Sequence, residues 1–228
     1  MFIGPQLLRR AGLIMAPDGR GIGRRGFLKA FGAVIASSGV APFEPVISGG
    51  DCYINRCFGL AFRPPVGWRY IDQREFPRLR EAQIVEEGLI SEGLLSAADP
   101  YVVMAKSGSS IPDALEASMT AYAEDLAFLE GESLEALPSM VARTLEKVLL
   151  EYELIAQGAV HEISGVDSIE YLSGFRLVTS DLEAAARCRT VLSVRRGAIF
   201  TFNFFDYPDS GVDARSDFDQ MIGSLAYA

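Results

Sequence analysis

The feature that most limits the fold of this chain is the alternation of apolar and polar residues in its C-terminal part. Successive side chains of a β-strand point to opposite faces of a sheet, so a period of two residues predicts strands. The strands that the alternation predicts are residues 159–163, 166–177, 188–194 and 198–205. Arg195, Arg196 and Gly197 separate the last two, which predicts a β-hairpin. We therefore expect an antiparallel sheet.

Helices are expected to cover this sheet. Phe200, Phe202 and Phe204 share one face of the last strand and should pack against a helix. A C-terminal helix is predicted to start at Ser216, with Asp219 at the reciprocal position of a capping box. The buried side of that helix would carry Phe218, Ile222 and Leu225.

The central part of the chain has a period closer to that of an α-helix. Two helices are predicted, one from Ser110 to Gly131 and one from Ser139 to Gly158. Their buried stripes would be Leu115, Met119, Tyr122, Leu126 and Leu129 in the first, and Val141, Leu145, Val148, Tyr152 and Ile155 in the second. Upstream strands are predicted at residues 53–62, 68–71 and 101–105, with Trp68 buried where two of them meet.

The N-terminal segment reads as an export signal. The stretch from Gly23 to Lys29 resembles the twin-arginine (Tat) consensus, whose characteristic positions are filled by Arg24, Arg25, Phe27, Leu28 and Lys29. The apolar run behind it, residues 30–41, is shorter than the roughly 20 residues of a spanning helix. A basic amphipathic helix is the alternative interpretation. We expect residues 1–41 to be a Tat signal peptide, 42–52 a linker, and 53–228 a single domain in the periplasm or another extracytoplasmic compartment.

The charge of the expected domain restricts its partners. Residues 1–50 hold six Lys/Arg and two Asp/Glu, which leaves 15 basic and 28 acidic residues, a net charge of −13, for residues 51–228. Such a field repels nucleic-acid phosphates and anionic lipids, and it favours basic partners or divalent cations. Nucleic acid is therefore not expected as a partner. Asp51 stands where a lipid-anchored protein has a small residue before its cysteine, so no permanent membrane anchor is expected either.

Few residues are suited to catalysis. His161 is the only histidine and is predicted on the exposed face of a strand. Cys188 lies on a predicted strand, where a buried, unreactive thiol is common. Cys52 and Cys57 complete a set of three cysteines, which allows one disulfide whose pairing the sequence leaves open. The G-x-S-x-G, S-x-x-K and H-E-x-x-H motifs are absent from the sequence.

Aspartates crowd the C-terminal stretch and suggest one candidate ion. Asp217 and Asp219 are explained by a helix N-terminus, which leaves Asp206, Asp209 and Asp213 as candidate metal ligands. Calcium prefers oxygen ligands of this kind, although the spacing does not fit an EF-hand. No cofactor is expected, with calcium as the one candidate.

The order of several short motifs resembles the PsbP-like family, whose fold is shared with the Ran-binding Mog proteins. The motifs are Tyr53-Ile54-Asn55 with Phe58-Gly59-Leu60-Ala61-Phe62, Pro65-Val66-Gly67-Trp68, Arg196-Gly197-Ala198-Ile199-Phe200-Thr201-Phe202, and Phe218 with Ile222-Gly223-Ser224-Leu225. The resemblance spans nearly all of residues 53–227. It implies an α+β fold, with an antiparallel β-sheet flanked by helices in an α/β/α sandwich. The helical insertion expected at residues 112–156 is long for that family, and the metal-binding residues of some members have no match here.

Members of that family are mostly assembly factors, extrinsic subunits or binding modules. The resemblance therefore implies an exported, non-catalytic binding or assembly module of the cell envelope that recognises a protein partner. The alternative is a carboxylate-dependent periplasmic hydrolase of unrecognised type. A deep pocket with two facing acids would favour the hydrolase, and a shallow groove would favour the module.

Overall fold

The computed structural model describes residues 52–55, 58–71, 100–106, 116–125, 132–147, 149–178, 183–210 and 213–228. The Tat motif with Arg24, Arg25, Phe27, Leu28 and Lys29 lies outside the described residues, as does Cys57. No described helix has the length and apolar character needed to cross a membrane.

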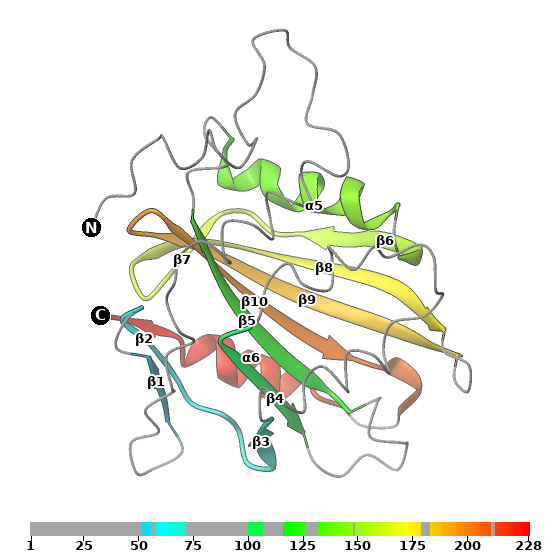
Figure 1. The fold of residues 1–228 in the computed structure, drawn as a ribbon, viewed down its shortest axis with the longest axis horizontal. Coiled ribbons are helices and arrows are strands. Elements are labelled where there is room, and N and C mark those ends of the chain that lie inside the picture. The colour runs from blue at the N-terminus through cyan, green and yellow to red at the C-terminus, as the bar shows by residue number, and fades with distance from the viewer. Residues whose placement is uncertain are drawn as a thin grey trace, which may run out of the picture. The chain divides into compact units, whose positions relative to one another are not determined.

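An eight-stranded antiparallel sheet forms the centre of the described fold (Figure 1). Its strand order is β3-β4-β5-β10-β9-β8-β6, and β7 also pairs with β8. The strands are β3 Trp68–Tyr70, β4 Val102–Lys106, β5 Ser118–Asp125, β6 Leu150–Gln157, β7 His161–Ile163, β8 Val166–Val178, β9 Glu183–Arg195 and β10 Ala198–Asp206. The prediction of strands in the C-terminal part is thereby confirmed. The α+β class also fits, because helices pack on this sheet.

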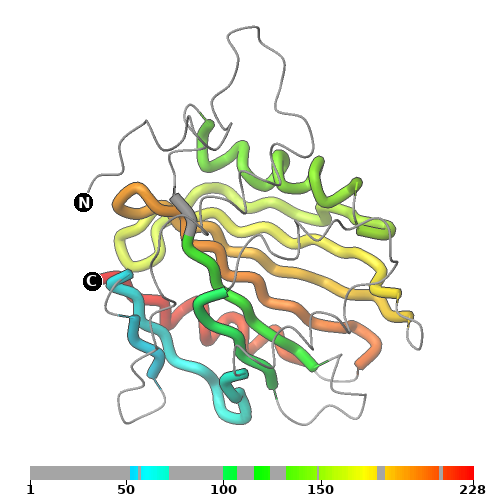
Figure 2. Tube along the Cα trace, in the orientation of Figure 1, coloured from blue at the N-terminus to red at the C-terminus, as the bar shows by residue number. Residues whose placement is uncertain are grey.

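The hairpin of β9 and β10 is confirmed with its turn. Arg196 and Gly197 have φ angles of 50° and 79°, and two successive positive φ angles match the right-handed twist of paired strands. Ala198 pairs with Arg195, and the register continues to Asp206 opposite Arg187. In Figure 2 the two strands and β8 run together as the longest part of the sheet.

The phenylalanine stripe of β10 faces the last helix, as predicted. Phe200, Phe202 and Phe204 are buried, and the Phe204 ring lies 5.3 Å from that of Phe218. Phe218 belongs to α6 Arg215–Gly223, whose Met221 and Ile222 are also buried. The capping box was wrong. Ala214, and not Ser216, is the N-cap residue, and its side chain makes no capping hydrogen bond. Asp219 contacts an arginine of the sheet instead.

The strand predicted at residues 53–62 is wrong, because the structure has two short strands there. These are β1 Tyr53–Asn55 and β2 Leu60–Phe62, which pair antiparallel with each other. Gly59 has a φ of +60°, and a Cβ at this position would lie 2.8 Å from the backbone oxygen of Ala228. With β11 Ala226–Tyr227 they form a three-stranded sheet, which packs in the same core cluster as the phenylalanine stripe and α6.

The helix predicted over residues 110–131 is also wrong where the structure describes it. Residues 118–125 form β5, which lies between β4 and β10. Met119, Thr120 and Ala121 are all buried, so this strand lacks the alternation of a strand with one exposed face. The 4-3-4-3 spacing of apolar residues fits a helix as well as a strand that is buried on both faces. Hydrogen bonding to β4 and β10 makes this segment a strand.

The second predicted helix is correct only in its first part. The helix α5 Leu137–Leu145 follows the 3-10 helix η3 Leu134–Ala136, and the chain then turns into the edge strand β6. Leu137 of α5 belongs to the same core cluster as Ile169, Leu192 and Ile199. Along their strands these three residues alternate with the residues that face α6, so they lie on the other face of the sheet. The two helices therefore contact opposite faces of the sheet.

Trp68 is half-buried, where burial was expected. Its indole Nε1 donates a hydrogen bond to Asp217 Oδ2 at 2.8 Å, and its ring lies 6.0 Å from that of Phe218. Lys106 Nζ also lies 2.8 Å from the same carboxylate oxygen. Asp217 thus ties α6 to β3 and β4.

Candidate functional site

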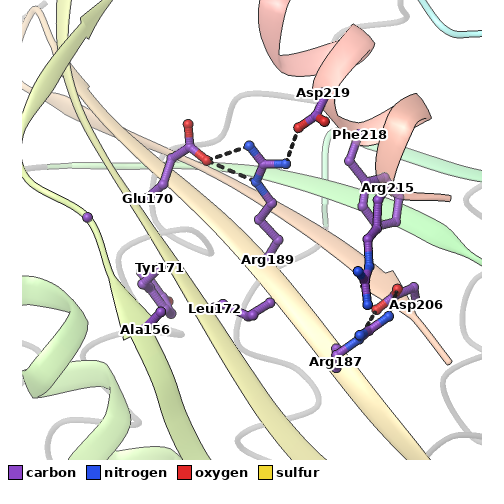
Figure 3. A pocket seen from close by; sticks show the side chains of 11 residues that line it. Ala156, Glu170, Tyr171, Leu172, Arg187, Arg189, Asp206, Arg215, Phe218 and Asp219 are labelled. Atoms are coloured by element: carbon purple, nitrogen blue, oxygen red, sulfur yellow. Dashed lines mark hydrogen bonds and ion pairs between the residues drawn. The ribbon is translucent and has the colours of Figure 1, made fainter. Parts of the chain in front are cut away.

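A pocket of about 480 Å³ opens beside α6, on the face of the sheet that this helix covers (Figure 3). Its floor is made by residues of four strands, and its wall by one side of α6. The floor residues share this face because they are cross-strand partners: Ala156 pairs with Leu172, Leu172 with Arg189, and Arg187 with Asp206. The wall residues Arg215, Phe218 and Asp219 stand three and four positions apart, which places them on one side of a helix.

One ion-pair group bridges the floor and the wall. Arg189 Nε and Nη2 both lie close to Glu170 Oε2, at 2.9 and 2.8 Å, and its Nη1 donates to Asp219 Oδ1. We call Glu170, Arg189 and Asp219 the Arg189 cluster. Burial lowers the pKa of Arg189, but the hydrogen bonds to Asp219 and Glu170 outweigh it and leave this pKa above its ordinary value. The arginine is therefore a fixed cation shared by two carboxylates.

A second group lies one step along β9. Arg187 Nε donates to Asp206 Oδ1 at 3.0 Å, and its Nη2 donates to Asp206 Oδ2. The Asp206 side chain is only 9% exposed, so this two-point pair is largely removed from water. Arg215 reaches from α6 toward this pair (Figure 3). We call Arg187, Asp206 and Arg215 the Arg187 cluster.

The carboxylates of this pocket are not arranged as an acid–base pair. Glu170, Asp206 and Asp219 each accept a hydrogen bond from an arginine. Catalysis by two carboxyl groups needs one of them protonated and the other free to act on water or substrate. Here each of the three is held by an arginine guanidinium instead. The arrangement is suited to binding charged groups.

The aspartates predicted as metal ligands do not meet around one point. Asp206 is turned to Arg187, and Asp209 is exposed in the 3-10 helix η4 Pro208–Ser210. Asp213 Oδ1 accepts the backbone N–H of Arg215 at 3.0 Å. Within the described ranges, no three His, Cys, Asp or Glu side chains lie together as a metal ion would require.

Of the residues that build the pocket, the sequence pointed only to Asp206 as a candidate site residue, in the role of a metal ligand. A signal for two of the others was present, because Arg187 and Arg189 flank Cys188 at the start of the strand predicted at residues 188–194. Charged residues two apart on a strand share a face and need partners or water there. His161 is exposed, as expected, and its Nε2 lies 3.4 Å from Glu170 Oε1, at the border of the Arg189 cluster.

Cys188 points to the opposite face from its two arginine neighbours and is buried. Burial raises the pKa of its thiol to about 12, and the thiol lies 3.4 Å from Thr190 Oγ1. Cys52 and Cys188 are both free thiols in the structure. The hypothesis of an unreactive Cys188 is thereby supported.

We expect Cys188 to resist alkylation by iodoacetamide in the folded domain at about pH 8, because almost none of a thiol with so high a pKa is thiolate at that pH. Cys52, which is partly exposed, should be modified first. Mass spectrometry of peptides from native and urea-unfolded protein measures the extent of alkylation at Cys52 and at Cys188. Modification of Cys188 in the native protein at the rate of Cys52 would show that this side of the sheet opens.

The comparisons with known proteins give a likeness of structure only. No family model and no curated protein matches the sequence. Among solved structures, the chain is similar to the cyanobacterial PsbP (CyanoP) of Synechocystis sp. PCC 6803, with 16% identity over 82% of this chain and 100% of that one, at a TM-score of 0.49. It is also similar to LpqN of Mycobacterium tuberculosis, described as involved in cell envelope biogenesis, with 12% identity over 78% and 85% of the two chains and a TM-score of 0.41.

A third similar structure is a protein of unknown function from Pseudomonas aeruginosa, described as a regulator, with 17% identity and a TM-score of 0.43. This match covers 53% of the present chain and 78% of that one. With identities of at most 17% and TM-scores of 0.41 to 0.49, none of the three assigns the chain to a family.

Proposed function

We propose that this protein is a Tat-exported, non-catalytic binding or assembly module of the cell envelope, of the PsbP-like kind, and that it recognises a protein partner at the pocket beside α6. The observation that carries the proposal is that each carboxylate of the pocket is paired with an arginine. Glu170, Asp206 and Asp219 are all paired with arginines, so the pocket offers fixed charges for recognition. Its walls come from the sheet and from one helix, which hold those charges in place.

The export signal and the charge support the same proposal. Arg24 and Arg25 with Phe27-Leu28-Lys29 are the address that the Tat pathway reads. The net charge of −13 on residues 51–228 attracts a basic partner over distances of a Debye length or so. The partner is therefore proposed to be a protein with a basic surface.

The hydrolase alternative makes a different use of the same pocket. It needs one of the three carboxylates to be released from its arginine when substrate binds. Neutral variants such as Glu170→Gln and Asp206→Asn would then abolish turnover without preventing substrate binding. The module requires no turnover at all.

Site-specific cross-linking tests the proposal in cells. A photoreactive residue at Ala156, which is exposed on the pocket floor, should form an adduct with a partner in envelope fractions. The matched control carries the same residue at Val66, which is 99% exposed and does not line the pocket. Equal adducts from both positions, or none from Ala156, would contradict recognition at the pocket. Hydrolytic activity lost in Glu170→Gln or Asp206→Asn would favour the hydrolase.

A further inference from the structure

We propose that the pocket recognises an extended partner segment with one basic and one acidic side chain two positions apart. The basic group binds at the Arg189 cluster through Glu170 and Asp219, and the acidic group binds at the Arg187 cluster through Arg215. This inference rests on the proposed function and names the chemistry of the partner segment.

The charges of the two clusters do not balance within each cluster. In the Arg189 cluster one guanidinium serves two carboxylates, which leaves an excess of one negative charge when the His161 imidazole is neutral. Asp219 is 66% exposed on its side chain, so its carboxylate is open to an incoming cation. In the Arg187 cluster two guanidiniums stand with one carboxylate, which leaves an excess of one positive charge. A ligand with both signs satisfies both clusters.

Among the described cations that line the pocket, Arg215 is the one without an ion pair. Its side chain forms no ion pair with any described residue, although it is exposed and lines the pocket. It is also the first residue of α6, where the positive end of the helix dipole makes a cation unfavourable. A carboxylate bound in the pocket would meet the Arg215 guanidinium.

The spacing of the two clusters defines the spacing of the ligand charges. Arg187 and Arg189 stand two residues apart on β9, which is about 6.6 Å along a strand. Side chains at positions i and i+2 of an extended segment have the same repeat and point the same way. Leu172 and Ala156 form an apolar part of the floor, against which the aliphatic stem of a lysine can lie.

Short peptides test this inference on the mature domain. The probe is an acetylated and amidated pentapeptide of alanine with lysine at its second position and glutamate at its fourth. A spacing control has lysine and glutamate adjacent, so that in an extended chain they point to opposite sides. NMR titration at low salt and about pH 8 should show binding to the probe about five- to tenfold tighter than to the spacing control.

Charge reversal at Arg215 gives the decisive comparison. The Arg215→Glu variant should prefer a peptide with lysine at both positions over the probe, and its melting temperature should equal or exceed that of the parent, because a carboxylate suits a helix N-terminus. Arg143→Glu, an exposed site on α5 against the other face of the sheet, changes the net charge equally and should leave the original preference intact.

The failures of the two proposals are distinguishable. If the parent binds both peptide spacings equally, or if Arg215→Glu keeps the preference of the parent, the inference is wrong. Cross-linking from Ala156 would then still support recognition of a partner at the pocket by other chemistry. If that cross-linking also fails, the proposed function is wrong as well.

Discussion

Between about pH 9 and pH 11 the domain is expected to unfold, because the folded state holds five acidic groups protonated in its interior. Burial raises the pKa of Tyr53 and of Cys188 to about 12 each, and it raises the pKa of Tyr101, Tyr171 and Tyr207 well above the ordinary phenol value. Ionising any of them in the folded state would put a negative charge into the core.

The direction of the effect follows from proton binding. In the unfolded chain the thiol ionises near 9.0 and the phenols near 10.0, so above these values the unfolded state binds fewer protons than the folded state. The free energy of unfolding then falls by about 1.4 kcal/mol per group for each pH unit. At about pH 11 the five groups together remove about 8 kcal/mol, which is comparable to the whole stability of a typical domain.

Two signals measure the transition: the ultraviolet absorbance of phenolate, which reports ionised tyrosine, and circular dichroism, which reports the fold. Both signals should change together in one cooperative step. Tyr101→Phe is the informative variant, because the Tyr101 hydroxyl is buried with no hydrogen-bond partner among the described residues. Its removal should cost no stability at neutral pH and should raise the pH of unfolding. Phenolate forming near pH 10 with the fold intact would show that the tyrosines are accessible to water.

Replacing both arginines of the signal, Arg24→Lys with Arg25→Lys, is expected to abolish export almost completely. A Tat signal is an address read by a receptor, so under the proposed function the precursor should accumulate in the cytoplasm. Lysine keeps the charge of the segment. The experiment therefore tests recognition of the arginine pair and leaves the electrostatics of the N-terminus unchanged.

The chain carries its own control for this experiment. Arg9 and Arg10 form a second arginine pair, which is not followed by Phe-Leu-Lys. The double replacement of Arg9 and Arg10 by lysine should leave export intact, as judged by fractionation and immunoblotting. If the Arg24 and Arg25 variant were still found outside the cytoplasm at the parental level, the Tat hypothesis would be wrong.

The sequence by itself determined the strands in which apolar and polar residues alternate with the two-residue period of the backbone. The hairpin of β9 and β10 could be predicted because Arg196-Gly197 interrupts two alternating runs, and its turn has the positive φ angles that such a hairpin needs. The faces of β10 followed from the same alternation, so the packing of Phe200, Phe202 and Phe204 against a helix was predicted, although the helix was not identified. The charge of −13 on residues 51–228 was also available without a structure.

The tertiary structure decided the elements in which the local sequence pattern and the pairing of strands in the sheet favour different secondary structures. Residues 118–125 are rich in helix-forming alanine and acidic residues, yet hydrogen bonding to β4 and β10 makes them a strand with both faces buried. Burial on both faces removes the alternation that would have predicted it. The edge strand β6 was predicted as a helix. Its register with β8 is irregular, so its apolar and polar residues do not alternate with a regular period of two.

The pocket, too, exists only in the tertiary structure. The roles of Arg187 and Arg189 depend on partners from the two strands that flank β9. These partners are Asp206 on β10 and Glu170 on β8. Arg215 and Asp219 come from a helix more than twenty residues later, and the sequence predicted that helix without its position over the sheet. Periodicity tells which side of an element a residue occupies, and only the packing of elements tells which other residues share the space in front of it.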